Sequence, residues 1–262
     1  MTNLNNQTHS SCRNCVNRKK LGFDFTMAFQ PIVNSKTSQI FGYEALVRGL
    51  NNESAFSIIS RVNDDNRYQF DQLCRKKAIR LAAKLGLKSV LSINFLPKSI
   101  YKPEVCIRAT IEAAKEYNFP LDRIMFEFSE IEHIDDPLFV QDIIEHYNHR
   151  GFLTAFDDFG SGYSGLNLLT QLQPNIVKLD MELIRNVDSN KRKQAIITHC
   201  LNLFNDLNLT PLAEGVETIN EMIWLQDAGI ELMQGFLFNK PGFECLPEVN
   251  FSNLKDSLSI IA

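Results

Sequence analysis

Eight short, almost continuously apolar runs alternate with longer amphipathic segments, and this alternation limits the possible folds more than any other feature of the chain. The runs span residues 25–33, 40–47, 89–95, 123–128, 152–157, 176–179, 209–213 and 232–236. Runs without polar alternation are typical of parallel strands that are buried on both faces. Strand and helix repeated over 262 residues predict an α/β fold, a (βα)8 barrel of the TIM type.

The segments between the runs carry recognisable helix signals, with one exception. Asp136 followed by Pro137 is typical of a helix N-terminus, and Thr218 and Glu221 have the spacing of a capping box. Only residues 34–39 separate the first two runs, which is too short for a crossover helix. We therefore expect a hairpin there and one antiparallel strand in an otherwise parallel barrel.

Composition and tails suggest a single domain in the cytoplasm. The net charge is −4, which does not favour electrostatic binding to a nucleic-acid polymer. No apolar run approaches the roughly 20 residues that span a bilayer, so no membrane contact is expected. We expect a flexible leader over residues 1–20, one domain over 21–250, and a C-terminal tail over 251–262 with a helix near 254–260.

The leader contains a C-x-x-C pair, Cys12 and Cys15. Such a pair is half of a zinc signature, and no second pair follows at ribbon or finger spacing. It is either an exposed, incidental pair or part of a metal or redox site, with His9 available as a third ligand.

Polar residues stand at or just after the ends of seven consecutive runs. They are Glu44, Asn94, Glu127 with Glu130 three residues later, Asp157 with Asp158, Lys178, Glu214 and Gln234. Because the C-terminal ends of barrel strands converge on one mouth, these side chains are expected to meet there. A turn is the alternative for the Asp- and Gly-rich stretch that starts at Asp157. Alternation along a strand predicts that Asp157 and Asp158 point to opposite sides and need different partners.

The residue types at the mouth indicate metal-assisted chemistry. Carboxylate and amide oxygens suit Mg²⁺ or Mn²⁺ rather than zinc, and so many like charges cannot stay ionised without cations between them. Two ions about 3.5–4 Å apart favour phosphoryl chemistry. Lys178 would then orient a nucleophilic water, and the forked donors of Arg48 could reach a phosphate. No His stands at a strand end, which argues against His-based acid–base catalysis.

Eight ordered motifs carry a family resemblance. They are FQPIV from Phe29, EALVR from Glu44, SINF around Asn94, EFSE from Glu127, DDFGSGYSGL from Asp157, KLD from Lys178, AEGVET from Ala213 and QGFLFNKP from Gln234. From about residue 25 to residue 241 the sequence resembles the EAL-domain family of cyclic di-GMP phosphodiesterases. It is most similar to stand-alone EAL proteins and to EAL domains linked to blue-light sensors.

The resemblance implies two Mg²⁺ or Mn²⁺ ions, with Ca²⁺ expected to inhibit. The ligands implied for the first ion are Glu44, Asn94, Glu127 and Asp157. Asp157 would bridge to a second ion that also uses Asp158 and Glu214.

Further roles follow from the same resemblance. Lys178 would hold the attacking water, Glu214 would also act as general base, and Gln234 would bind near the water and the substrate. Glu130 would brace the loop at residues 160–165, and Glu217 would support the side of the second metal. The residues implied to contact the dinucleotide are Gln30, Leu46 and Arg48.

The implied activity is hydrolysis of cyclic di-GMP to linear 5′-pGpG, by in-line attack of water on one phosphorus with release of the 3′ oxygen. This reaction lowers the level of a bacterial second messenger. The alternatives are a receptor that binds cyclic di-GMP without cleaving it and a protein-interaction domain that has lost the nucleotide. Family members commonly pair, so a homodimer is expected, whereas the sequence identifies no regulatory partner.

Overall fold

The computed structural model describes residues 21–100, 102–129, 136–162, 165–252 and 254, and in these residues a nine-stranded sheet forms the centre of the fold. The strands are β1 (Thr26–Asn34), β2 (Gln39–Arg48), β3 (Val90–Asn94), β4 (Ile124–Ser129), β5 (Leu153–Phe159), β6 (Ile176–Leu179), β7 (Thr210–Ala213), β8 (Leu232–Gln234) and β9 (Gly242–Phe243). Eight of them correspond to the eight predicted runs.

Strand pairing closes the sheet into a barrel. Strands β2 to β8 are parallel and pair in chain order. Strand β1 runs antiparallel to β2 along its whole length and to β8 at Ile32, Val33 and Asn34. The predicted barrel with one antiparallel strand is therefore confirmed, and β1 is that strand. The two-residue strand β9, which pairs with β1, was not predicted because so short a segment has no periodicity.

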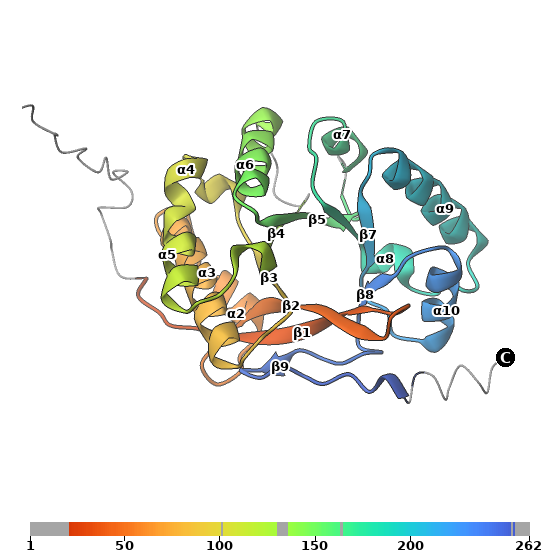
Figure 1. Ribbon diagram of the computed structural model, residues 1–262, viewed down its shortest axis with the longest axis horizontal. Helices are drawn as coiled ribbons and strands as arrows, with labels where there is room; N and C mark the ends of the chain where they lie inside the picture. Colours follow the sequence, from red (N-terminus) through yellow and green to blue (C-terminus); the bar gives the residue numbers. More distant parts are fainter. Residues whose placement is uncertain (1–20, 101, 130–135, 163–164, 253, 255–262) are drawn as a thin grey trace, which may run out of the picture.

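Helices surround most of the barrel (Figure 1). They are α2 (Ala55–Ile59), α3 (Arg67–Lys84), α4 (Pro103–Cys106), α5 (Arg108–Glu116), α6 (Pro137–His149), α7 (Gly165–Leu169), α8 (Met181–Ile184), α9 (Lys191–Asp206) and α10 (Ile219–Asp227), with short 3-10 turns at Pro97–Ser99 and Leu121–Arg123. In Figure 1, α3 to α6 lie to the left and above, α7 to α10 lie to the right, and β9 runs below β1. The predicted caps are confirmed, since Asp136 accepts a hydrogen bond from the Phe139 amide and Thr218 forms a capping box with Glu221.

The inside of the barrel is built in two layers. The lower layer is an apolar cluster separate from the main core, and its residues are at most 6% exposed: Ile32, Met125, Ala155, Ile176, Leu212 and Leu232. Side chains two positions apart on a strand share a face. The residues that follow Ile176 and Leu212 by two positions are Lys178 and Glu214, so the upper layer at the mouth is charged.

Several predictions concern residues that the structure does not describe. The leader over residues 1–20 with Cys12 and Cys15 lies outside the described residues, as do residues 255–260 of the predicted C-terminal helix. Within the described part, the cysteines Cys74, Cys106, Cys200 and Cys245 are free thiols.

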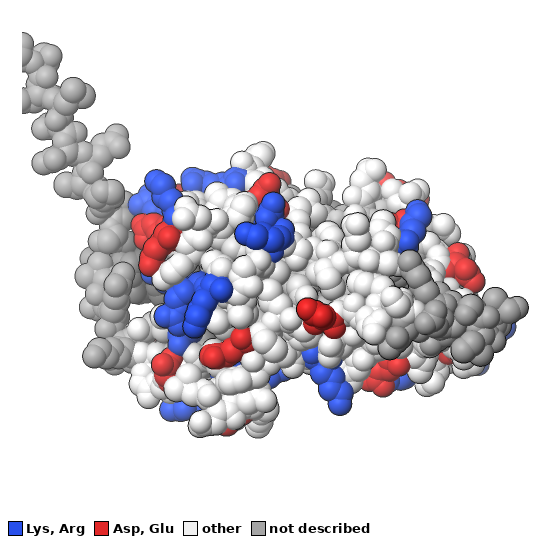
Figure 2. Space-filling model, turned by 60° about the horizontal axis from the view of Figure 1, so that its bottom comes forward, with Lys and Arg blue, Asp and Glu red and all other residues white. Residues whose placement is uncertain are grey.

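The described helices and one face of the surface bear on the expectations drawn from hydropathy and charge. Among the described residues, no helix combines the length and the apolarity that crossing a bilayer requires. The face in Figure 2 carries cationic and anionic side chains in small interspersed groups. That face therefore presents no broad basic surface for a polyanion.

Candidate functional site

Lys178 lies at the centre of the charged layer. It comes from β6, is fully buried, and its Nζ lies 2.8 Å from Glu214 Oε1, 3.0 Å from Glu127 Oε2, 3.0 Å from Asp157 Oδ1 and 3.8 Å from Glu44 Oε2. Two of these carboxylates come from β2 and β4, one comes from β5, and Glu214 directly follows β7. The strand ends therefore bring these five side chains together at one mouth, as the sequence predicted.

Three side-chain amides fix one edge of the cluster. Asn94 Nδ2 donates to Glu44 Oε1 at 2.7 Å, and Gln234 Nε2 donates to Glu44 Oε2 at 2.7 Å and to Gln30 Oε1 at 3.2 Å. Gln30 Nε2 in turn donates to the carbonyl oxygen of Asn239 at 3.2 Å. Sequence patterns missed the contribution of Asn239, because it is made by a backbone carbonyl 209 residues away from Gln30.

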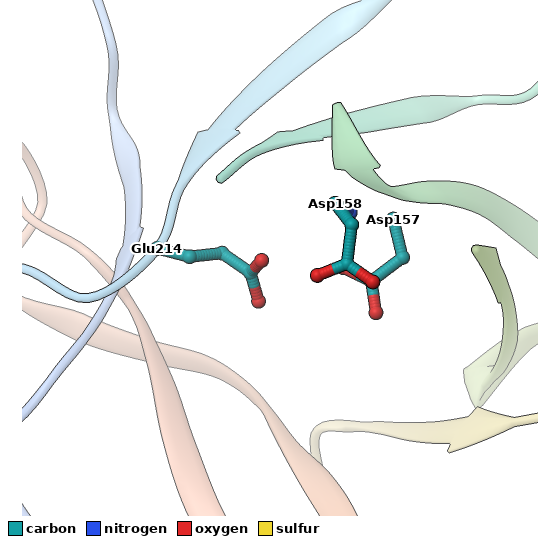
Figure 3. Close-up of side chains that lie close together, drawn as sticks. All are labelled: Asp157, Asp158 and Glu214. Carbon is teal, nitrogen blue, oxygen red and sulfur yellow. The ribbon is translucent and has the colours of Figure 1, made fainter. Parts of the chain in front are cut away.

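Asp157, Asp158 and Glu214 form a second cluster of oxygen atoms. One carboxylate oxygen from each lies within 4.8 Å of the others, and Figure 3 shows Glu214 reaching toward the two aspartates from the opposite side. The expectation that the two aspartates point to opposite sides is therefore wrong. The pairing of β5 with β6 shifts register between Phe156 and Phe159, and Asp158 has a φ of 57°. This left-handed residue breaks the alternation of an extended strand.

Burial and charge shift the acid–base equilibria of this site. Burial, reinforced by neighbouring carboxylates, raises the pKa values of Glu127 and Glu214 well above the usual range, and the ammonium of Lys178 only partly offsets this. Burial alone would lower the pKa of Lys178, but Asp157, Glu127 and Glu214 raise it well above its usual value. One ammonium is therefore not enough to keep all the carboxylates of the upper layer ionised.

The donor set fits a pair of hard divalent cations. Four carboxylates face the Lys178 ammonium, those of Glu44, Glu127, Asp157 and Glu214. A fifth, Asp158, lies beside two of them. If all are ionised, the excess is four negative charges, which two divalent ions would balance. Glu127 Oε1 is buried and has no hydrogen-bond partner among the described residues. An unsatisfied carboxylate oxygen inside a cluster of oxygen donors is an available metal ligand.

The structure describes three of the four other residues that the resemblance singled out. Glu217 Oε1 accepts a hydrogen bond from Arg185 Nη2 at 2.8 Å, so its carboxylate is engaged in an ion pair. Arg48 Nη1 donates to the carbonyl oxygen of Val47 at 2.7 Å, and Leu46 is half-buried on β2. Glu130 lies outside the described residues. The roles implied for these four residues stay predictions.

Comparisons with known sequences give a consistent family assignment. A family model with the description EAL domain matches residues 16–241. The chain is 31% identical to the blue light- and temperature-regulated antirepressor BluF of Escherichia coli K12 over 229 residues, covering 87% of this chain and 57% of BluF. It is 28% identical to the probable cyclic di-GMP phosphodiesterase PdeG of the same organism over 225 residues, covering 81% of this chain and 44% of PdeG. The chain thus spans about half the length of these relatives.

Solved structures also match along most of the chain. A standalone versatile EAL protein from Vibrio cholerae O395 in its c-di-GMP bound form is 66% identical, with a TM-score of 0.87, and the match covers 89% of this chain and 99% of that one. The manganese/cy-diGMP complex of Klebsiella pneumoniae BlrP1 is 35% identical, with a TM-score of 0.81, and the match covers 87% of this chain and 58% of that one.

Proposed function

Because this chain belongs to the EAL-domain family, we propose that it is a metal-dependent phosphodiesterase that hydrolyses cyclic di-GMP to linear 5′-pGpG. The observation that carries this proposal is the convergence of Glu44, Glu127, Asp157 and Glu214 on Lys178 at the barrel mouth. The cyclic di-GMP complexes of the similar Vibrio cholerae and Klebsiella pneumoniae proteins support the substrate.

Two Mg²⁺ or Mn²⁺ ions belong to the proposal. Glu44, Asn94, Glu127 and Asp157 would hold the first, and Asp157, Asp158 and Glu214 would hold the second, whose proposed ligands are the ones that cluster within 4.8 Å. When bound, the ions would supply positive charge at the scissile phosphate and lower the pKa of the attacking water. Manganese and calcium complexes of the Klebsiella pneumoniae protein support a divalent ion at this type of site.

The chain's own residues would orient and deprotonate the nucleophile. The Lys178 ammonium is fixed by carboxylates from three sides, so it can hold a water and stabilise negative charge that develops at phosphorus. Glu214 would accept the proton of that water, and a carboxylate whose pKa is raised by burial suits this task. Gln234, held by Glu44, would donate to the substrate or the water.

Substrate binding would use the rim around the charged layer. Gln30 and Leu46 would contact the dinucleotide, and Arg48 would pair with a phosphate through its fork of donors. Glu130 would brace the loop at residues 160–165, and Glu217, held by Arg185, would support the side of the second metal.

A cytoplasmic homodimer completes the proposal. Free thiols at Cys74, Cys106, Cys200 and Cys245 are what a reducing compartment maintains. Light scattering over a range of protein concentrations tests the assembly, and a mass that stays monomeric throughout would contradict it.

A turnover assay tests the activity. Purified protein is incubated with cyclic di-GMP in Mg²⁺, Mn²⁺ or Ca²⁺, and the products are separated by liquid chromatography. We expect 5′-pGpG with Mg²⁺ or Mn²⁺ and little or none with Ca²⁺. Asp157→Asn is the matched control, since it keeps the side-chain shape and removes the charge. The absence of 5′-pGpG with both Mg²⁺ and Mn²⁺ would contradict the proposal.

A second candidate function is binding without cleavage. The observation that favours it is a structure of Klebsiella pneumoniae BlrP1, 29% identical to this chain, that holds cyclic diGMP without metal ions. Saturable binding of cyclic di-GMP with no product over several hours in Mn²⁺ would select this candidate.

A further inference from the structure

A fully buried ion pair lies outside the barrel, between the helices and the sheet. Asp71 and Arg75 are one turn apart on α3, and Arg75 Nη2 lies 2.8 Å from Asp71 Oδ2 with both side chains at most 1% exposed. Arg75 Nη1 donates to the hydroxyl of Tyr147 on α6 at 3.3 Å. Gln72 Nε2 donates to Asp71 Oδ2 at 3.3 Å. This charge pair therefore connects α3 with α6.

The same pair contacts the C-terminal end of β3 and the middle of β4. Asp71 Oδ1 accepts a hydrogen bond from the Leu96 amide at 3.2 Å. The guanidinium of Arg75 lies 5.6 Å from the centre of the Phe95 ring and 5.1 Å from that of Phe126. The two rings are themselves 5.8 Å apart in an edge-to-face arrangement. The buried pair thus contacts outward-facing residues of β4 and residues just after β3, its neighbour in the sheet.

Each of the two rings is adjacent in sequence to a proposed metal ligand. Phe95 directly follows Asn94, and Phe126 directly precedes Glu127. Because neighbouring side chains on a strand point to opposite faces, fixing the two rings outside fixes Asn94 and Glu127 inside. The two ligands are register partners, and the Phe95 amide donates to the Glu127 carbonyl oxygen at 2.9 Å.

Stability alone does not account for this pair. Burial raises the pKa of Asp71 despite the neighbouring Arg75, because taking an ionised carboxylate out of water costs free energy. Arg75 Nε has no hydrogen-bond partner among the described residues. Replacing a buried ion pair by apolar residues of similar volume is often neutral or stabilising. Apolar side chains cannot replace the hydrogen bond to the Leu96 amide or the contacts of the guanidinium with the Phe95 and Phe126 rings.

We propose that Asp71 and Arg75 are positioning residues, which hold Asn94 and Glu127 at the spacing that the first divalent ion requires. The inference rests on the proposed function, because it assumes that these two side chains are metal ligands. Residues that orient metal ligands from behind typically change metal affinity by about 10- to 100-fold when they are replaced.

The test compares metal affinity with stability. The double variant Asp71→Leu/Arg75→Met removes the ion pair and keeps the volume close to the original. Mn²⁺ affinity is measured by electron paramagnetic resonance of the free ion, and the melting temperature by calorimetry. We expect the affinity for the first ion to fall about 10- to 100-fold, while the melting temperature stays within about 5 °C of the unaltered protein.

Two further variants separate positioning from general packing. Thr110→Val, on α5, alters a buried hydroxyl that has no hydrogen-bond partner among the described residues, and it should leave Mn²⁺ affinity unchanged. Arg75→Lys keeps the charge but loses the planar fork that Phe95 and Phe126 contact, so affinity should fall about tenfold. This milder variant tests the proposal even if the double variant does not fold.

A double-mutant cycle shows whether the effect passes through Asn94. Asp71→Leu/Arg75→Met lowers Mn²⁺ affinity by some factor when Asn94 is present. In an Asn94→Ala background this factor should be at least about threefold smaller, because one of the two positioned ligands is already absent.

The outcomes separate the two proposals. Unchanged Mn²⁺ affinity in Arg75→Lys, or an equal loss in the presence and absence of Asn94, would overturn the positioning role. Failure of the unaltered protein to bind Mn²⁺ would overturn the proposed function itself.

Discussion

The two layers inside the barrel sit on the same strands two residues apart, yet they are chemically opposite. Ile176 lies below Lys178, and Leu212 lies below Glu214. The lower layer is entirely apolar and buried, so its side chains are stabilised simply by leaving water. The upper layer places several carboxylates around a buried ammonium, where each charge requires a partner. One layer holds the barrel together, and the other is incomplete without cations.

The apolar layer also strengthens the interactions within the charged one. It lies beneath the charged side chains, and in apolar surroundings charges interact more strongly than they do in water. Variants in the lower layer should therefore change stability with little effect on metal binding, whereas variants in the upper layer should change how the site binds and responds to metal ions. The predictions below test this division, from the largest expected effect to the smallest.

Asp157→Ala should have the largest effect. Asp157 contacts Lys178 and belongs to the second oxygen cluster, with Asp158 and Glu214. Its loss should lower the turnover of cyclic di-GMP by at least about a thousandfold, since each 1.36 kcal/mol lost from transition-state stabilisation costs tenfold in rate. Glu214→Ala should behave in the same way. Circular dichroism should show an unchanged fold, and either variant retaining a tenth of the activity would refute the assignment.

Lys178→Met should destabilise the metal-free protein. Removing the ammonium leaves buried carboxylates without the cation that lies within 3.0 Å of three of them. Breaking such a buried pair typically costs about 3–5 kcal/mol. Urea unfolding in the presence of a chelator measures this cost, and added Mn²⁺ should restore part of the loss. A variant as stable as the original under chelation would show that the carboxylates are not held as charges.

Leu212→Ala tests the opposite layer. Leu212 is fully buried in the apolar layer, so its truncation should lower the free energy of unfolding by about 2–5 kcal/mol. Because Leu212 contributes no ligand atom, Mn²⁺ affinity should stay within about twofold. Urea unfolding and a Mn²⁺ titration on the same sample give both values. A large loss of affinity would mean that the two layers are not separable.

Divalent ions should stabilise the original protein moderately. At an ion concentration about 100-fold above the dissociation constant, each site adds about 2.7 kcal/mol to the free energy of unfolding. Unfolding in Mn²⁺ and in chelator measures this gain. Leu212→Ala should retain the gain and Asp157→Ala should lose most of it, and equal gains in both variants would place the ion elsewhere.

The strand order and most of the site could be predicted because both follow from local patterns. The short connection at residues 34–39 was enough to predict an antiparallel strand, and β1 is that strand. Residues at strand ends had to meet once the barrel was established. Lys178 and the carboxylates around it follow from that rule alone.

What could not be predicted depends on backbone geometry or on contacts between distant residues. Alternation failed at Asp158 because its φ of 57° lies outside the extended region. The ion pair of Glu217 with Arg185 joins residues 32 positions apart. Asp71 and Arg75 have the spacing of an ordinary helical ion pair, so only the fold reveals that they are buried against Phe95 and Phe126.

The number of Mn²⁺ ions bound per chain tests the central claim most directly, since the five carboxylates, when all are ionised, exceed the ammonium by the charge that two divalent ions supply. Equilibrium dialysis followed by elemental analysis gives this number for the original protein and for Asp157→Ala. Two ions per chain in the original protein and at most one weakly held ion in the variant are the predicted result. An original protein that binds no Mn²⁺, or a variant that binds as many ions as the original, would contradict the account.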